Sequence, residues 1–133
     1  MTLAEIKDEI MFQTNNAAED IDDYLPHFVD YINDGYDRIV RVWSKNHLPN
    51  TDYPKLSANT DTPLVPEWTH RALCDWATWL IYRNGNPQKQ NRGRAYYESF
   101  MAVLSQIADE GGKDGLNEDG TQKQYKNFVN IPG

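Results

Sequence analysis

The stretch that decides the fold is PEWTHRALCDWATWLIYRNG, residues 66–85, followed directly by NPQKQNRGRAYYESFMAVLSQIADE, residues 86–110. Both segments carry apolar residues at helical spacing, and a turn rich in Asn and Gly separates them. Gly85 suits the left-handed residue that closes a helix, while Asn86 and Pro87 suit the N-cap and first position of the next one. The sequence therefore predicts an antiparallel helical hairpin.

The apolar residues of the two arms indicate how they pack. One side of the first arm carries Trp68, Trp76, Trp79 and Leu80. The second arm repeats apolar residues at spacings of three and four, at Tyr96, Phe100, Val103, Leu104 and Ile107. We expect one shared core made of Trp76, Trp79, Leu80, Phe100 and Leu104, with Ile32, Ile39 and Trp43 packing across it.

Two further helices are predicted before the hairpin. Thr2-Leu3-Ala4-Glu5 is a capping box, so a short amphipathic helix starts there and fades at Gln13. The segment YLPHFVDYINDGYDRIVRVW, residues 24–43, carries an apolar stripe over about five turns, with Pro26 in its first turn. Gly35 interrupts this helix at a cost of about 1 kcal/mol relative to Ala, which a close helix crossing would offset.

The remaining segments read as a loop and an arm. Asn46 to Val65 holds several prolines and few apolar residues, which favours a long ordered loop over a strand, with Pro66 starting the helix that follows. Gly111 and Gly112 are expected to end the last helix. The chain thus divides into a helical domain, residues 1–110, and a C-terminal arm, residues 111–133. The fold class is all-α, a four-helix bundle-like domain.

The end of the arm carries an apolar tip after a polar linker: Tyr125, Phe128, Val129 and Ile131. Such a tip gains burial only on another surface, so we interpret it as a docking segment, on another subunit or a partner's sheet edge. A frayed terminus packed weakly on its own domain is the alternative.

Composition limits the functional classes. The 133 residues, 39% hydrophobic, suit one core that needs no metal or disulfide. The net charge of −7 argues against tight binding of nucleic acid but suits a surface past which DNA slides. No apolar stretch approaches the ~20 residues that span a bilayer, and the first residues lack a signal-peptide pattern. We therefore expect synthesis in the cytoplasm and no membrane contact.

Possible chemical sites have simpler interpretations. The acidic run of residues 19–23 with His27 suits helix-dipole chemistry better than a metal site, and residues 115–126 lack both end ligands of a calcium loop. His70 and Cys74, four residues apart on an apolar helix, read as a packed pair rather than a base and nucleophile. No phosphate loop, dinucleotide fingerprint or serine elbow occurs. We expect no enzyme activity, no cofactor and no metal.

Four basic residues surround the hairpin turn: Arg83, Lys89, Arg92 and Arg94. They are either solvated helix residues or a contact for the acidic side of a neighbouring identical subunit, since head-to-tail contacts in a ring join two different surfaces.

The helix lengths, the Pro-rich loop, the turn residues and the polar tail over residues 1–110 together resemble the head-tail connector (adaptor) proteins of tailed bacteriophages. The resemblance implies a structural virion protein: a ring of identical subunits, commonly twelve, beneath the portal protein, with a tail or neck protein on the other side. Genomic DNA would pass through its lumen without specific binding. The long loop, with Tyr53 and Leu56, and the arm tip are the implied partner contacts. A small acidic helical regulatory or inhibitory binding protein is the alternative.

Overall fold

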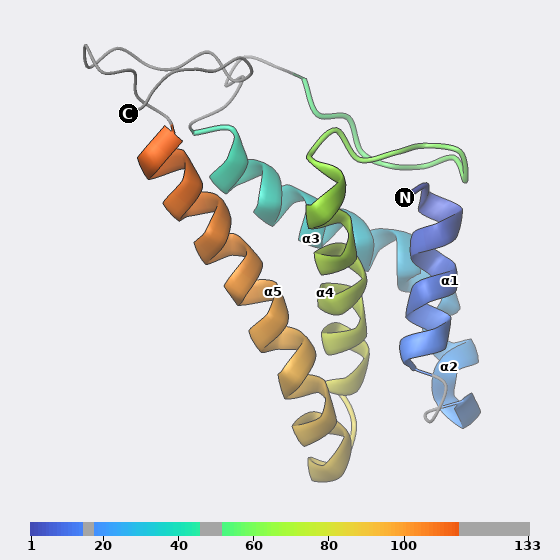
Figure 1. Cartoon of the computed structure of the whole chain (residues 1–133). Helices are drawn as coiled ribbons and strands as arrows, with labels where there is room; N and C mark the ends of the chain where they lie inside the picture. Colours follow the sequence, from blue (N-terminus) through green and yellow to red (C-terminus); the bar gives the residue numbers. More distant parts are fainter. Residues whose placement is uncertain (15–17, 46–51, 115–133) are drawn as a thin grey trace.

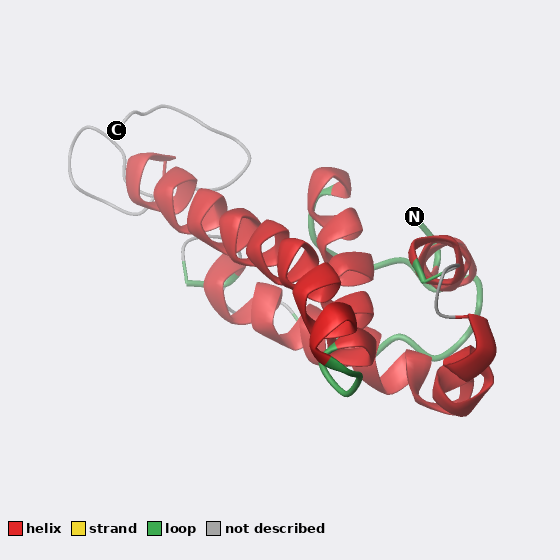
Figure 2. Ribbon diagram, turned by 90° about the horizontal axis from the view of Figure 1, so that it is seen from below, coloured by secondary structure: helices red, strands yellow, loops and turns green. Residues whose placement is uncertain are grey.

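The computed structural model describes residues 1–14, 18–45 and 52–114, and within these ranges the chain is all-α, with no strand (Figures 1 and 2). The helices in chain order are α1 (Leu3–Gln13), α2 (Ala18–Tyr24), η2 (Leu25–His27), α3 (Phe28–Trp43), η3 (Glu67–Thr69), α4 (His70–Tyr82) and α5 (Pro87–Asp114). Figure 1 shows α4 between α1 and α5, with α3 crossing behind it. The predicted all-α fold class is confirmed.

The capping box predicted at the start of α1 is present. The Thr2 hydroxyl accepts from the backbone N–H of Glu5 at 3.2 Å, and the Thr2 backbone N–H donates to the Glu5 carboxylate at 2.8 Å. The next free N–H groups of the helix end, those of Leu3 and Ala4, donate to loop carbonyls of Asp61 and Asn59. The loop thus satisfies donors that a helix start leaves open.

The second predicted helix is divided in two. The acidic run expected to precede it belongs to the separate helix α2, whose Ile21 is buried, and α3 begins only at Phe28. Pro26 lies between them in the 3₁₀ turn η2, where a residue without an N–H donor interrupts the α-helical ladder. A prediction that placed Pro26 inside the first turn of one long helix was therefore wrong by about one turn.

Gly35 lies at a close crossing of α3 and α4, as predicted. A Cβ atom at this position would meet the Trp76 side chain at 3.1 Å. The Trp76 indole N–H donates to the Asp34 carboxylate at 2.7 Å, and the Arg38 guanidinium lies 4.6 Å from the Trp76 ring centroid. The missing side chain of glycine lets the tryptophan lie flat against α3.

The hairpin of α4 and α5 is confirmed, but its turn differs in detail. Asn86 caps α5 by accepting from the backbone N–H of Lys89 at 2.9 Å, and Pro87 is its first residue. Gly85 does not adopt the left-handed conformation that we predicted; a Cβ there would instead meet the Lys89 side chain at 2.6 Å. Close approach, rather than backbone handedness, explains the glycine. At the other end α5 continues to Asp114, so the glycines at 111 and 112 do not end it.

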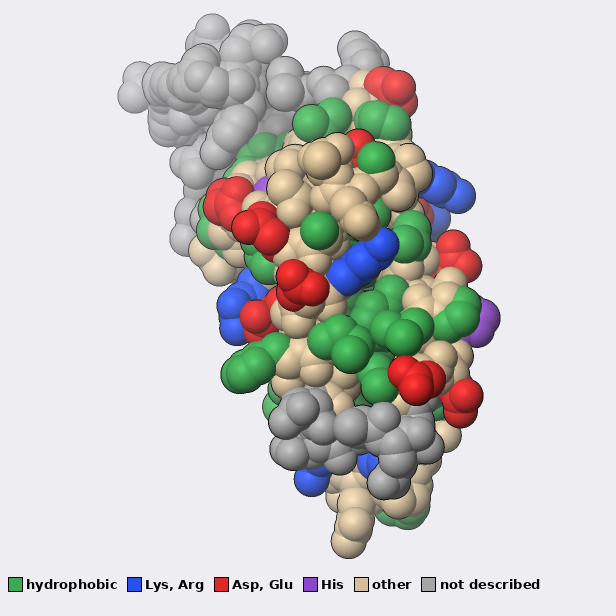
Figure 3. All heavy atoms as spheres, turned by 90° about the vertical axis from the view of Figure 1, so that its right-hand side faces the viewer, with side chains coloured by type: hydrophobic (Ala, Val, Ile, Leu, Met, Phe, Trp, Pro, Cys, Tyr) green, Lys and Arg blue, Asp and Glu red, His purple; other side chains and the backbone are tan. Residues whose placement is uncertain are grey.

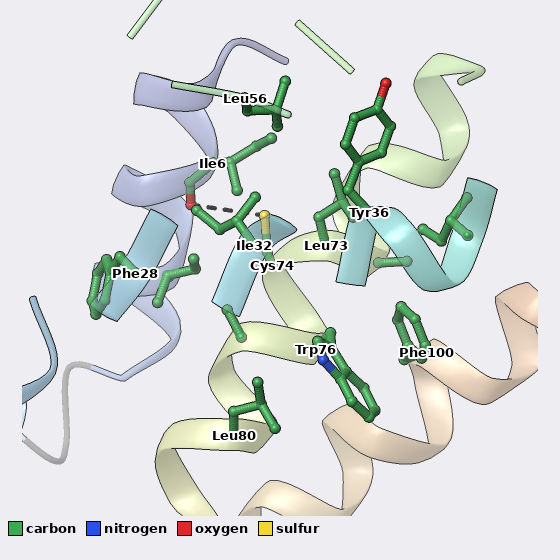
Figure 4. Packing of buried hydrophobic residues seen from close by; sticks show 14 of the residues in the cluster. Ile6, Phe28, Ile32, Tyr36, Leu56, Leu73, Cys74, Trp76, Leu80 and Phe100 are labelled. Atoms are coloured by element: carbon green, nitrogen blue, oxygen red, sulfur yellow. Dashed lines mark hydrogen bonds between the residues drawn. The ribbon is translucent and has the colours of Figure 1, made fainter. Parts of the chain in front are cut away.

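The core agrees with the prediction at its centre and differs at its edge. Trp76 and Phe100 face each other between α4 and α5, with ring centroids 4.6 Å apart (Figure 4). Trp79 and Leu104 are only partly buried. Trp68, expected on the packed side of the first arm, precedes α4 in η3 and is 42% exposed. Of the other predicted core residues, the buried ones are Leu80, Ile32, Ile39 and Trp43.

Candidate partner-binding surfaces

The first candidate surface is an open groove of about 510 Å³ between α3 and the loop after it, which we call the acidic groove. Its charged lining consists of Asp30, Asp34, Asp37 and Lys55. The loop forms its other wall because the Asn33 side-chain amide makes two hydrogen bonds of 2.9 Å to the backbone of Leu56. The groove is thus fixed in place and carries more negative than positive charge.

The three aspartates of the acidic groove differ in their partners. Asp34 pairs with Arg38 at 3.0 Å and Asp37 with Arg41 at 2.7 Å, each one helical turn on. Burial tends to raise the pKa of Asp34, but hydrogen bonds from Arg38 and Trp76 outweigh it and hold that pKa below its usual value. Asp30 is exposed and has no ion pair within the described ranges. Its charge is available to a partner.

The second candidate surface is the basic end, defined by the four predicted residues around the hairpin turn. Arg83, Arg92 and Arg94 are exposed there, and Lys89 is half-buried. Arg83 lies near α3 of its own chain, where its charge partly offsets the rise that burial causes in the pKa of Tyr31 and adds a small contribution to the lowered pKa of Asp34. Arg92 and Arg94 make no ion pair with any residue of the described part of the chain. These two arginines are the ones left for a partner.

The loop places its two predicted contact residues differently from our expectation. Tyr53 is half-buried and lines the acidic groove. Leu56 is buried in the core of its own chain, 3% exposed, so its side chain is not available to a partner and the prediction for it is corrected. The loop instead exposes Leu64, whose backbone N–H donates to the Tyr36 hydroxyl at 2.8 Å.

The sequence carries only part of the signal that identifies Leu64 as exposed. It lies in the extended segment between two prolines, where successive side chains point to opposite sides. Pro63 and Val65 are buried, and Leu64 between them is 54% exposed, close in sequence to the exposed Trp68. The alternation was present in the sequence, but nothing in it told which of the three residues faced outwards. The arm-tip residues Tyr125, Phe128, Val129 and Ile131 lie outside the described residues.

A third surface was not predicted: an open groove of about 740 Å³ between α1 and α5, with α4 as its floor. We call it the Phe12 groove, after the Phe12 side chain in its lining, which is 75% exposed. The rest of the lining is Glu9, Gln13, Arg71, Asp75, Ala95, Tyr96 and Ser99. Figure 3 faces the side of the molecule that carries α1, where hydrophobic side chains gather among acidic ones.

Cys74 and His70 do not form a chemical pair. Cys74 is fully buried, and its thiol lies 3.8 Å from the Ile6 carbonyl oxygen (Figure 4). Burial raises its pKa to about 12, which keeps the thiol protonated at neutral pH. The His70 ring is 2.8 Å from the Val65 carbonyl through Nε2 and 2.9 Å from the Met1 nitrogen through Nδ1. Both groups are used in packing, as predicted.

The described ranges hold no group of three or more His, Cys, Asp or Glu side chains placed to bind a metal ion together. None of the helices described has the length and apolar character needed to cross a bilayer.

Comparison with known proteins returned nothing: no protein-family model, no curated protein and no solved structure matches this chain.

Proposed function

We propose that this chain is a structural virion protein, a head-tail connector that forms a ring of identical subunits, twelve in number, beneath the portal of a tailed bacteriophage. It would extend the DNA channel towards a tail or neck protein after synthesis in the cytoplasm of the bacterial host. The proposal rests on the resemblance in helix lengths and turn residues, now joined by one structural observation.

That observation is the presence of two surfaces of opposite charge on different elements. The basic end offers Arg92 and Arg94, and the acidic groove offers Asp30. A ring repeats one heterologous contact, in which a surface of one subunit meets a different surface of the next. Opposite charges on these two surfaces favour that contact and disfavour pairing of like surfaces. The charge distribution therefore supports a head-to-tail assembly.

The portal contact is proposed for the exposed residues Leu64 of the loop and Trp68 of η3, and for the arm tip. These two large apolar side chains are 54% and 42% exposed and are available for burial on assembly. The acidic net charge of the chain supports passage of DNA without adhesion. We further propose that the free protein is largely monomeric and closes its ring on the portal.

Native mass measurement of the full chain, alone and mixed with the portal protein of the same phage, tests the proposal. We expect a monomer alone and a portal-bound ring with the portal's stoichiometry. A stable free ring would refute only the templating step. A monomer that ignores the portal and binds one other protein in a one-to-one complex would overturn the connector function and favour the regulatory alternative.

A further inference from the structure

The Phe12 groove exposes an aromatic side chain at the edge of a hollow that three helices enclose. Phe12 is the most exposed of the large hydrophobic side chains in the described ranges, and Met11 beside it is 40% exposed. Single exposed apolar residues are normal, but an apolar rim on a ready-made hollow marks a contact site. Tyr96 and Ala95 of α5 provide apolar surface on the opposite wall.

The charges of the groove favour a cationic occupant. Its lining holds two carboxylates and one guanidinium, and Arg71 already donates to Glu9 at 2.8 Å. The remaining carboxylate, Asp75, accepts a hydrogen bond of 3.0 Å from the Gln13 amide, and its burial raises its pKa above the usual value. A nearby cation would relieve the cost of this half-buried charge. The site therefore suits a segment that carries both an aromatic and a basic side chain.

We propose that the Phe12 groove binds the end of this same chain, residues 121–131, while the subunit is free. This segment combines Tyr125 and Phe128 with Lys123 and Lys126, and no acidic residue occurs from position 121 to the end. Aromatic rings that cover Phe12 and a lysine that reaches Asp75 satisfy both halves of the site at once. The more acidic groove on α3 offers such a segment no exposed aromatic ring of comparable size.

The reach of the chain permits this contact within one subunit. The 15 residue steps from Ser99 in the groove to Asp114 at the end of α5 rise about 22 Å at 1.5 Å per residue. Ten residues separate Asp114 from Tyr125, and a chain of ten residues spans at most roughly 33 Å, with a root-mean-square length of roughly 18 Å by chain statistics. Because this length matches the span, the effective concentration of the tip at its own groove is on the order of millimolar.

The inference does not depend on the connector proposal. A chain that holds its own arm in this groove could have any binding function, and a connector could leave its arm free. If the groove proposal and the connector proposal both hold, a partner that binds the arm during assembly also uncovers Phe12. Release of the arm and exposure of the Phe12 groove would then occur together.

Thiol reactivity in the full-length protein tests the inference, because Cys74 is buried with a pKa of about 12 and gives no background. A Ser99→Cys variant places a thiol in the groove. Ser105→Cys is the matched control, since Ser105 is also exposed on α5 but does not line the groove. The rate of modification by a small disulfide reagent is measured for each, with and without the arm changes Tyr125→Ser and Phe128→Ser.

We expect the arm changes to accelerate modification of Ser99→Cys about tenfold, which corresponds to a groove that is open roughly one tenth of the time when the arm is intact. The rate of Ser105→Cys should stay constant. Equal rates for Ser99→Cys with either arm would overturn the inference. Protection that grows with protein concentration would also overturn it, because the arm would then come from another molecule.

Discussion

The two arms of the hairpin, α4 and α5, were predicted from the same kind of signal and are used in opposite ways. Nearly every residue of α4 is buried, because α1, α3 and α5 all contact it. In α5, between Pro87 and Asp109, only Gly93, Phe100 and Ile107 are buried, each seven residues after the last. One helix is the centre of the core, and the other lies on it along a single line. Most of the surface of α5 is therefore available for contacts.

The largest expected effect on stability comes from removing a large buried side chain from this line of α5 residues. Phe100→Ala should lower the free energy of unfolding by about 3–5 kcal/mol, because the ring is fully buried against Trp76. Met101→Ala, on the neighbouring and 40% exposed position, should cost less than about 1 kcal/mol. Thermal or denaturant unfolding of both variants measures the difference. Similar losses would mean that α5 is buried on more than one side.

A second, smaller effect is expected where the two arms approach most closely. In Gly93→Ala the new Cβ would lie 2.7 Å from the Cβ of Tyr82, an atom that cannot move away without its backbone. Alanine gains about 1 kcal/mol in helix propensity, but the forced separation should leave a net loss of about 1–3 kcal/mol. Ser105→Ala on the exposed side of α5 is the control, within about 0.5 kcal/mol of the parent. A stabilised Gly93→Ala protein would show that the hairpin has room to open.

A third and weaker test compares two carboxyl groups, Asp75 on the uncovered side of α4 and Asp34 on α3. Burial raises the pKa of Asp75, so its carboxylate costs stability at neutral pH, whereas the lowered pKa of Asp34 means that its carboxylate contributes stability there. At pH 7 we expect Asp75→Asn to stabilise and Asp34→Asn to destabilise, each by less than about 1 kcal/mol.

The difference in stability between each variant and the parent should change with pH in a predictable direction. The contribution of Asp34 is present above its unfolded pKa, about 3.9, and is lost as the pH falls through its lower folded value. The cost of Asp75 disappears as the pH falls from its raised folded value towards the unfolded one. The melting temperature of each variant should therefore approach that of the parent as the pH falls from about 7 to about 2. Parallel curves would contradict the assignment of the two carboxyls.

The smallest effect on stability, and the largest on assembly, is expected at the start of α5. Arg92→Glu with Arg94→Glu should change the free energy of unfolding by less than about 0.5 kcal/mol, because both side chains are exposed and form no ion pair with the described residues. Under the proposed function this variant should not join portal-bound rings. Asp30→Arg in a second preparation should restore assembly of mixed rings. Normal assembly of the double variant alone would exclude the basic end as a subunit contact.

How much of this could be read from the sequence differs between the two arms. The seven-residue recurrence of Phe100 and Ile107 is visible in the sequence, and so is the nearly continuous apolar character of α4. The Phe12 groove is not, because it depends on α1 and α5 lying on either side of α4. Phe12 itself follows the α1 stripe closely enough to pass for a core residue. It is 75% exposed because it lies two residues after Ile10, on a different side of the helix from the buried Ile10 and Thr14.

Other differences arose where tertiary contacts overruled a local pattern. Leu56 lies in a loop of polar composition, and it is buried because Asn33 binds its backbone at both the N–H and the carbonyl. Trp68 has the residue type of a core position but precedes the first turn of α4. Gly85 matched a familiar helix-capping signal, but the glycine is instead required because the Lys89 side chain lies too close for a Cβ atom. In each case the outcome depends on a residue distant in the sequence, or on local backbone geometry that the residue type alone does not specify.

The close approach at Gly93 also has a mechanical consequence. It holds the two arms together beside the turn, while the rest of α5 extends past α4 towards the end of α3 (Figure 1). A helix of 28 residues is roughly 42 Å long at 1.5 Å per residue. Gly93 lies roughly 32 Å from Asp114, so pivoting the helix by about 5° at Gly93 would move its far end by about 3 Å. Because Gly93 lies near one end of α5, a slight repacking beside Tyr82 would be amplified into a larger displacement of the other end of the helix, where the chain continues beyond Asp114.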